Sequence, residues 1–270
     1  MRSVASVIPA GGVGRRLGRA TPKQFLAIGG VPILVRTVRC FTRHPRVGLV
    51  VVAAPAALVG RTARLLGRYL PAVRVSSLDG SPAAGPALGA RGRNVGGSVA
   101  GARGAVASSR HGASVPVPVL VVPGGAERQD SVVRGLEAVP ASFDLVLVHD
   151  AVRPFVSGAL IDRVIDAARE TGAAICALPI AETVKRVRDG AVDTTVDRTG
   201  LWVVQTPQGF RTAVLREAHD KARRDGVVGT DDAMLVERLG HPVRVVLGLV
   251  ENIKITTPAD LGRARRWTAR

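Results

Sequence analysis

Apolar runs and amphipathic segments alternate along most of the chain. The apolar runs are rich in Val, Leu, Ile and Ala, and they predict buried strands at residues 4–8, 47–53, 73–75, 117–122, 145–148 and 173–178. The segments between them place apolar residues on one side of a helix, and they predict helices at residues 31–41, 56–70, 128–139 and 158–168. This alternation predicts an α/β fold of Rossmann-like type, with a mainly parallel sheet covered by helices on both faces.

The loops that follow three of the predicted strands carry glycine or charged residues. These loops begin at Pro9, Pro123 and His149. Because the carboxyl ends of parallel strands meet at one edge of a sheet, where α/β proteins bind ligands, we expect the three loops to surround a single cleft.

Two segments depart from this pattern in a chain that we otherwise assign to one domain over residues 1–270. Residues 79–116 are rich in Gly, Ala, Ser and Arg, which predicts a flexible surface insertion, with a lid over a site as the alternative. Residues 182–204 carry β-branched residues around Asp189-Gly190, which predicts a projecting antiparallel hairpin. Because such a hairpin usually needs a partner to bury it, we interpret it as a dimerisation arm, with a solvated surface hairpin as the alternative.

The composition narrows the class of protein. With 46% hydrophobic and 22% charged residues, the chain is neither a disordered tail, nor a collagen, nor a disulfide-rich mini-protein. No apolar run approaches the roughly 18 residues of a membrane helix, and residues 4–8 are too short for a signal peptide. Cys40 and Cys176 lie singly in apolar surroundings, which predicts buried thiols in a reducing compartment, so we expect a cytoplasmic protein.

The net charge of +17 raises the alternative of a basic nucleic-acid-binding protein. The arginines are spread along almost every segment, however, and aromatic stacking partners are scarce, which argues against specific nucleic-acid binding. Of the 38 basic residues only four are lysines. Because lysine offers a compact charge where arginine offers a planar fork, Lys23, Lys185 and Lys254 are of particular interest.

A glycine-rich loop at residues 9–17, with the sequence PAGGVGRRL, directly follows the first predicted strand. Glycine allows backbone N–H groups to close around a phosphate. The loop lacks the Gly-Lys-Ser/Thr ending of a Walker A motif, and Leu17 replaces the last glycine of a dinucleotide-binding loop. Four basic residues add more positive charge than a dinucleotide requires: Arg15, Arg16, Arg19 and Lys23. The segment therefore predicts a triphosphate site, with a glycine turn and incidental arginines as the alternative.

Several further segments accompany this loop and the Pro-Lys-Gln that trails it. They are residues 124–132 (GGAERQDSV), 148–154 (VHDAVRP), 195–208 (TVDRTGLWVVQTPQ), 230–232 (TDD) and 251–256 (ENIKIT). In this order they resemble the 2-C-methyl-D-erythritol 4-phosphate cytidylyltransferase family of the non-mevalonate isoprenoid route. The resemblance covers the chain from about residue 4 to residue 261, apart from the insertion.

The resemblance implies an enzyme that transfers CMP from CTP to 2-C-methyl-D-erythritol 4-phosphate, giving 4-diphosphocytidyl-2-C-methyl-D-erythritol and pyrophosphate. It implies that Arg16, Lys23 and Lys254 stabilise the charge that develops when two polyanions meet. The acceptor phosphate is itself the nucleophile, so no general base is needed and His149 is expected to pack at a strand end. A ribitol 5-phosphate cytidylyltransferase is the alternative.

The same resemblance implies two sets of binding residues. CTP would be held by Ala10, Gly11, Gly12, Gly14, Gly125, Ser131 and Ala151. The acceptor would be held by Arg153, Thr206 and Thr230 of one chain and by Thr183 and Arg198 from the arm of a second subunit, which implies a homodimer. Ala126 stands where the family often carries Asp, so any help from that side chain is lost.

Asp150 is the first candidate for a metal ligand. It follows the apolar run 145–148, which would place its carboxylate at the mouth of the cleft, and Mg²⁺ is commonly held there by few carboxylates and by phosphate oxygens. Glu251 is a second candidate. A strand-end Asp that caps the next turn is the alternative interpretation of Asp150.

Overall fold

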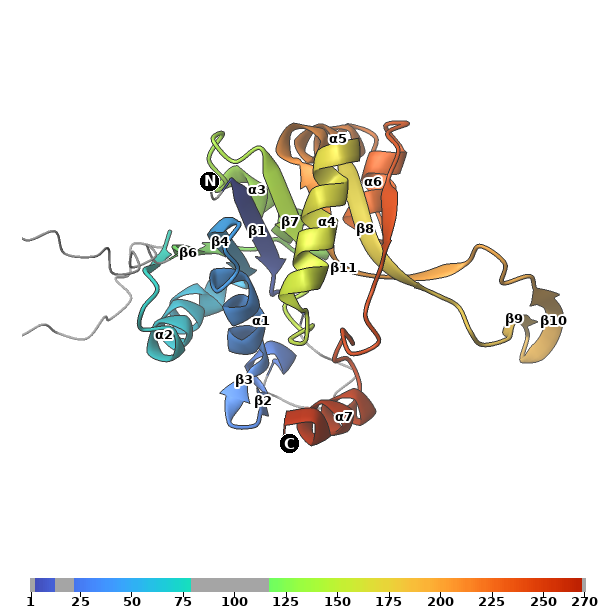
Figure 1. Cartoon of the computed structure of the whole chain (residues 1–270), viewed down its shortest axis with the longest axis horizontal. Helices are drawn as coiled ribbons and strands as arrows, with labels where there is room; N and C mark the ends of the chain where they lie inside the picture. Colours follow the sequence, from blue (N-terminus) through green and yellow to red (C-terminus); the bar gives the residue numbers. More distant parts are fainter. Residues whose placement is uncertain (1–2, 13–21, 79–116, 269–270) are drawn as a thin grey trace, which may run out of the picture.

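The central feature of the fold is a twisted sheet. The computed structural model describes residues 3–12, 22–78 and 117–268. Within these residues eight strands form one sheet in the order β12-β8-β11-β7-β1-β4-β6-β5 (Figure 1). In that order the strands span Arg244–Leu247, Ala173–Pro179, Trp202–Arg211, Leu145–Val148, Val4–Pro9, Val47–Ala54, Val119–Pro123 and Val75–Ser77. Neighbouring strands are parallel except where β11 pairs with β7 and β8, so the prediction of a mainly parallel sheet is confirmed.

Helices cover both faces of the sheet, as predicted. One face carries α1 (Ile33–Thr42), α2 (Val59–Tyr69) and α4 (Gly158–Thr171), and the other carries α3 (Arg128–Glu137), α5 (Thr212–Arg224) and α6 (Asp232–Glu237). Phe41 and Leu160 lie in the core on the first face, and Phe210 and Leu215 lie in the core on the second. The sheet is therefore buried on both sides, which explains why its strands read as nearly continuous apolar runs.

Where a predicted element corresponds to an observed one, the two differ mainly at their ends. The strands β11 and β12 have no counterpart among the predicted sheet strands. The helix predicted at 31–41 begins two residues later, because Val31–Pro32 (β3) pairs with Ala27–Ile28 (β2) and Pro32 has no N–H to donate. In the helix predicted at 56–70, the first residues form a 3₁₀ turn and the α-helix begins at Val59.

One predicted strand is misplaced. The strand expected at 73–75 is observed at Val75–Ser77, because the N–H of Val73 instead donates to Leu70 O and closes the turn after α2. The predicted insertion at 79–116 lies outside the described residues.

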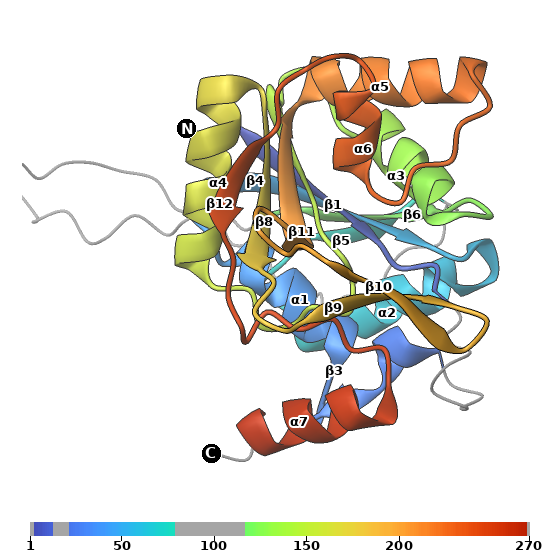
Figure 2. The same cartoon turned by 90° about the vertical axis from the view of Figure 1, so that its right-hand side faces the viewer.

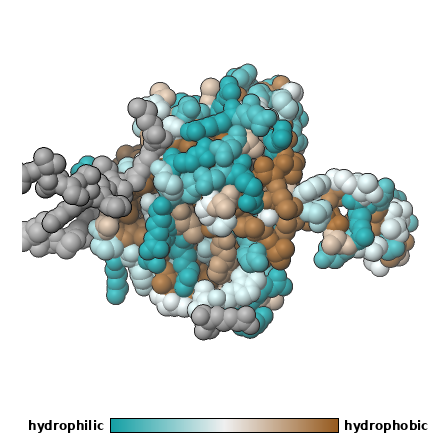
Figure 3. Space-filling view, in the orientation of Figure 1, coloured by the Kyte–Doolittle hydropathy of each residue, from teal (hydrophilic) through white to brown (hydrophobic). Residues whose placement is uncertain are grey.

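The predicted hairpin is observed over a shorter range than 182–204, because residues 202–204 pair with β8 in the central sheet. β9 (Val184–Arg188) and β10 (Ala191–Val196) pair antiparallel around Asp189 and Gly190, which both have positive φ, as in the tight turns that suit hairpins. The arm extends away from the body of the molecule, and apolar surface is seen where it leaves the body (Figures 1 and 3). Trp202 and Val203 are exposed at that point.

The C-terminal helix α7 (Pro258–Thr268) lies apart from the sheet, beside the β2–β3 pair (Figure 2). A small apolar cluster joins it to the loops after β7 and before α7, through Val152, Ile255 and Leu261. The N–H of Ile255 donates to Val152 O at 3.0 Å, so this cluster fixes the segment that carries Lys254 against the segment that carries Asp150. None of the described helices is both long enough and apolar enough to span a membrane.

Candidate active site

The three loops at the carboxyl ends of β1, β6 and β7 meet around one cavity of about 250 Å³, as predicted. We call it the nucleotide cavity. Its lining comes from segments far apart in the sequence: Pro9, Ala10, Gly11, Gly12, Lys23, Gln24, Gly125, Ala126, Glu127, Arg128, Ser131, Asp150, Ala151, Val152 and Lys254. The cavity thus brings together most of the residues expected to hold CTP. Gly14, expected to hold CTP, and Arg16, expected to stabilise the developing charge, lie outside the described residues.

The start of the glycine loop is fixed by its backbone. Ala10 N–H donates to Ala53 O at 2.7 Å, and Ala10 O accepts from Nε2 of the buried Gln24 at 2.7 Å. Gln24 follows Lys23 in a short 3₁₀ helix, so its hydrogen bond also places that lysine opposite the loop. A Cβ atom on Gly12 would lie 3.2 Å from Lys23 Cε, so glycine at this position leaves room for the lysine chain.

The loop before α3 is shaped around Ser131. Its hydroxyl accepts from Gly125 N–H at 3.2 Å and donates to Glu127 O at 3.1 Å. A Cβ atom on Gly125 would lie 2.1 Å from Asp130 Cβ, so only glycine fits there. Because a hydroxyl oxygen has two acceptor positions, Ser131 keeps one for a ligand in the cavity.

The carboxylate of Asp150 is surrounded by three basic side chains. Its Oδ2 lies 3.0 Å from Lys254 Nζ and 3.4 Å from Arg153 Nε, and its Oδ1 lies 3.3 Å from Arg128 Nε. Burial opposes ionisation of this carboxyl, but the charges of Lys254, Arg128 and Arg153 outweigh burial and hold its pKa well below the ordinary value. Asp150 is therefore a carboxylate at neutral pH, and its side chain faces cations.

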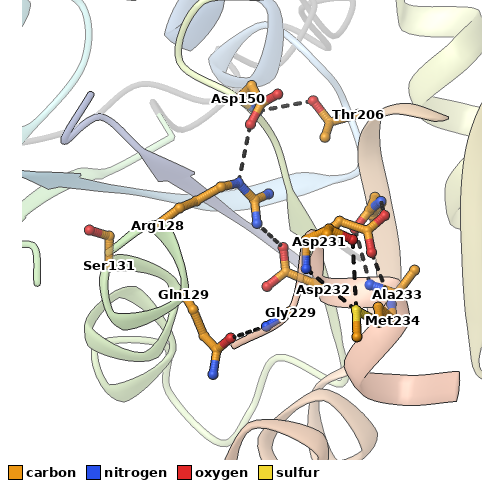
Figure 4. Close-up of polar contacts among 12 residues, drawn as sticks. Arg128, Gln129, Ser131, Asp150, Thr206, Gly229, Asp231, Asp232, Ala233 and Met234 are labelled. Carbon is orange, nitrogen blue, oxygen red and sulfur yellow. Dashed lines mark hydrogen bonds and ion pairs between the residues drawn. The ribbon is translucent and has the colours of Figure 1, made fainter. Parts of the chain in front are cut away.

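Two of these cations are also held by a second acceptor. Arg153 Nη1 donates to Asn252 O at 2.7 Å. Arg128 Nη1 donates to Asp232 Oδ2 at 2.7 Å, a contact drawn in Figure 4. Burial lowers the pKa of Arg128, but Asp232 and Asp150 raise it more, so its pKa lies above the ordinary value. The guanidinium groups are thus fixed before any ligand arrives.

His149 is buried and packs against Phe41, with 4.9 Å between ring centroids, which confirms its expected packing role. It also forms hydrogen bonds. The Asp150 N–H donates to Thr206 Oγ1 at 3.0 Å, Thr206 Oγ1 lies 3.2 Å from His149 Nδ1, and His149 Nε2 lies 3.0 Å from Arg153 O. A neutral His149 ring with its proton on Nε2 satisfies all of these hydrogen bonds. Nε2–H then donates to Arg153 O, and the Thr206 hydroxyl accepts from the Asp150 N–H and donates to Nδ1.

Burial holds the pKa of His149 down to about 4, with smaller opposing effects from its neighbours. The unfolded chain binds this proton near pH 6.5, so the folded state loses stability as pH falls from about 6.5 to 4. In the wild type, His149 should lower the unfolding free energy by about 3 kcal/mol between these two pH values. We expect His149→Gln to abolish this pH-dependent decrease. Urea denaturation at several pH values measures it. His241→Gln, at a half-buried histidine outside both cavities, is the comparison variant, and an unchanged slope in His149→Gln would contradict the assignment.

A second cavity of about 280 Å³, which we call the acceptor cavity, adjoins the first. It is lined by Arg128, Asp150, Arg153, Val204, Gln205, Thr206, Gln208, Thr230, Asp231 and Lys254. The three acceptor residues expected from the same chain therefore lie together. Thr183 and Arg198 are exposed on the arm and line neither cavity of their own chain.

Sequence reasoning missed several residues that shape the site. Arg128 lines both cavities and contacts two carboxylates, Gln24 holds the glycine loop, and Asn252 Nδ2 donates to Thr206 O at 2.8 Å. All three lie inside the segments that carry the family resemblance. Their partners are distant in sequence, so no local pattern indicates what they do. Glu251, the second metal candidate, is exposed and lines neither cavity.

Comparisons with known proteins agree with this geometry. Residues 4–80 and 105–269 match the family model described as IspD: 2-C-methyl-D-erythritol 4-phosphate cytidylyltransferase. The chain is 40% identical to the enzyme of that name from Geobacter metallireducens, over 96% of this chain and 94% of the relative, and 40% identical to that from Syntrophotalea carbinolica, over 98% and 96%. The crystal structure of the enzyme of that name from Thermus thermophilus is similar with a TM-score of 0.68 and 36% identity, covering 98% of both chains.

Proposed function

Because this chain belongs to the 2-C-methyl-D-erythritol 4-phosphate cytidylyltransferase family, and is thus a nucleotidyltransferase enzyme, we propose that its two adjoining cavities transfer CMP from CTP to 2-C-methyl-D-erythritol 4-phosphate. The products are 4-diphosphocytidyl-2-C-methyl-D-erythritol and pyrophosphate, in isoprenoid precursor synthesis. The proposal rests on one observation: the nucleotide cavity and the acceptor cavity share a boundary. Arg128, Asp150 and Lys254 line both cavities there.

The reaction brings two polyanions into contact, so its barrier is largely electrostatic. An oxygen of the acceptor phosphate attacks the α-phosphorus of CTP, a new P–O bond forms, and the bond to the pyrophosphate leaving group breaks. The nucleophile is already ionised near neutral pH, so no side chain has to remove a proton. Lys254 and Lys23 line the cavity where this charge develops, and Arg16 belongs to the same proposed set.

Cytosine recognition in this proposal uses few groups. Backbone groups at Ala10 and Gly125 border the cavity, and the Ser131 hydroxyl retains one acceptor position for the amino group of the base. Ala151 also lines the cavity, within reach of a ribose. Ala126 contributes only a methyl group, so the proposed recognition relies on the backbone at that position.

Mg²⁺ is part of the proposal, with Asp150 as its protein ligand. Among the described residues no group of three or more His, Cys, Asp or Glu is placed to hold a metal ion. One ionised carboxylate in a cavity shaped for a triphosphate fits Mg²⁺, which is usually held by one or two carboxylates with phosphate oxygens. When bound, the ion would neutralise phosphate charge. Lys254 and Arg153 orient the carboxylate that would receive it.

A homodimer completes the proposed acceptor site. Arg153, Thr206 and Thr230 line the acceptor cavity, and Thr183 and Arg198 would reach it from the arm of a second subunit. The apolar side chains exposed on the arm and at its base, including Val187, Trp202 and Val203, support an interface there. A cytoplasmic location is also proposed, since Cys176 is buried, Cys40 is half-buried and both are free thiols, as is usual for proteins in a reducing compartment.

Pyrophosphate release, measured with each nucleoside triphosphate and each acceptor, tests the proposal. We expect turnover with CTP and 2-C-methyl-D-erythritol 4-phosphate, and far slower turnover with UTP, ATP or GTP. Omitting the acceptor is the control, because it exposes simple hydrolysis. Clear preference for ribitol 5-phosphate would overturn the acceptor and favour the ribitol alternative, which differs only in the acceptor cavity.

A further inference from the structure

Asp232 is a buried carboxylate to which the proposed reaction gives no role. It is 1% exposed and lies in the first turn of α6. Its Oδ2 accepts from Arg128 Nη1 at 2.7 Å, and its Oδ1 lies 3.1 Å from Nε2 of the buried His219 (Figure 4 draws Asp232 with Arg128). A buried carboxylate is costly unless it is paired, and here both oxygens have partners.

The partner of Asp232 stands at the boundary of the two cavities. Arg128 lines the nucleotide cavity, the acceptor cavity and a small cavity of about 60 Å³ beside α6. Its fork spans two carboxylates: the contact with Asp232 is 2.7 Å long, and the contact with Asp150 is 3.3 Å long. The shorter contact is with the carboxylate that lines neither the nucleotide cavity nor the acceptor cavity.

We propose that Asp232, supported by His219, is a positioning residue that holds the Arg128 guanidinium between the nucleotide and the acceptor. The proposal rests on the proposed function. Burial raises the pKa of Asp232, but Arg128 and His219 lower it more, so the residue is an anion that only accepts hydrogen bonds. His219 Nε2 therefore carries the proton, and this bond from α5 fixes the orientation of the carboxylate on α6.

The charges around Arg128 explain why Asp232 is needed to position it. Without Asp232, the carboxylate of the described residues that still pairs with Arg128 is Asp150. The guanidinium would then close on Asp150, occupy the oxygens proposed for the metal, and withdraw its donors from both cavities. With Asp232 in place, Arg128 keeps its position when a ligand engages Asp150.

A double-mutant cycle tests this inference. Asp232→Asn keeps the size of the side chain and removes its charge, and we expect it to lower kcat/KM by about 10- to 100-fold, the scale of misplacing one preorganised donor. In an Arg128→Met background the same substitution should cause little further loss, because Asp232 acts through Arg128. Losses that simply multiply, or wild-type kcat/KM in Asp232→Asn, would overturn the inference.

Two further variants separate positioning from folding. Asp232→Glu, which keeps the charge, should recover part of the loss seen with Asn, and His219→Gln should weaken activity in the same direction by a smaller factor. If Asp232→Asn fails to fold, the cycle is run with His219→Gln and Arg128→Met. Asp220→Asn, at an exposed Asp on α5 paired only with Arg223 among the described residues, is the matched control and should behave as wild type.

Calorimetric titration with CTP, without acceptor, separates this inference from the proposed function. We expect Asp232→Asn to weaken CTP binding by about 10-fold in the wild-type background and hardly at all in the Arg128→Met background. Such coupling without turnover of 2-C-methyl-D-erythritol 4-phosphate would refute the proposed acceptor and keep the role of Asp232. Normal turnover without coupling would support the proposed acceptor and refute the role of Asp232.

Discussion

Lys254→Met is expected to lower kcat by about two to three orders of magnitude, the scale of removing one preorganised charge contact from a transition state. The Lys254 ammonium lies 3.0 Å from Asp150 and lines both cavities, where the two phosphates would meet in the proposed reaction. Methionine keeps most of the length of the side chain and removes only its charge. Because the backbone beside Lys254 is bonded to Val152, the substitution leaves the loop in place.

Steady-state pyrophosphate release, with CTP and acceptor varied separately, measures the effect. The loss should fall mainly on kcat, because the charge acts most strongly where the new bond forms. Lys221→Met is a matched control: Lys221 and Lys254 side chains are both 40% exposed, but Lys221 lies on α5 and pairs with Asp225. A Lys254→Met rate within about threefold of the control would remove Lys254 from the proposed catalytic set.

Arg153→Ala and Arg198→Ala are each expected to lower kcat/KM for the acceptor by about 100-fold or more, the scale of losing a charged phosphate contact. Arg153 lines the acceptor cavity, and Arg198 lies exposed on the arm. If each site combines Arg153 of one chain with Arg198 of the other, a mixed dimer of the two variants contains one intact site and one doubly defective site. The purified mixed dimer should therefore carry about half as many intact sites as the wild-type dimer.

The experiment requires that the variants exchange subunits, which co-expression with two affinity tags provides. Activity of the purified mixed dimer is compared with that of each parent variant. Arg186→Ala, on an exposed arm residue outside the proposed site, mixed with Arg153→Ala is the control for dimer exchange. If the mixed dimer of Arg153→Ala and Arg198→Ala is as inactive as its parents, each site is built within one chain and the shared-site proposal fails.

Much of the fold could be predicted because it depends on local pattern. The runs at 4–8 and 145–148 are apolar on both faces, so they identify buried central strands without any knowledge of their neighbours. Asp189-Gly190 identifies the arm because these residues adopt the positive φ that a tight hairpin turn needs. The glycine loop after β1 likewise indicates a phosphate site from its own composition.

β11 shows where local pattern is insufficient. It lies inside the sheet and runs antiparallel to both neighbours, yet it contains Gln205, Thr206 and Gln208, all buried. Polar residues are stable there because other elements complete their hydrogen bonds: Gln205 donates to Leu249 O at 2.8 Å and Gln208 to Asp231 Oδ2 at 2.7 Å. No period-two apolar pattern survives in this stretch.

The sequence by itself determined most of the strands and helices up to residue 178, the glycine loop, the arm and the set of residues that resemble a cytidylyltransferase. The tertiary structure decided which charges act on one another. Arg128 lies 22 residues from Asp150 and 104 residues from Asp232, and it contacts both. Such contacts leave no periodic trace, because they arise only when folding brings distant side chains together in a buried site where an unpaired charge is too costly.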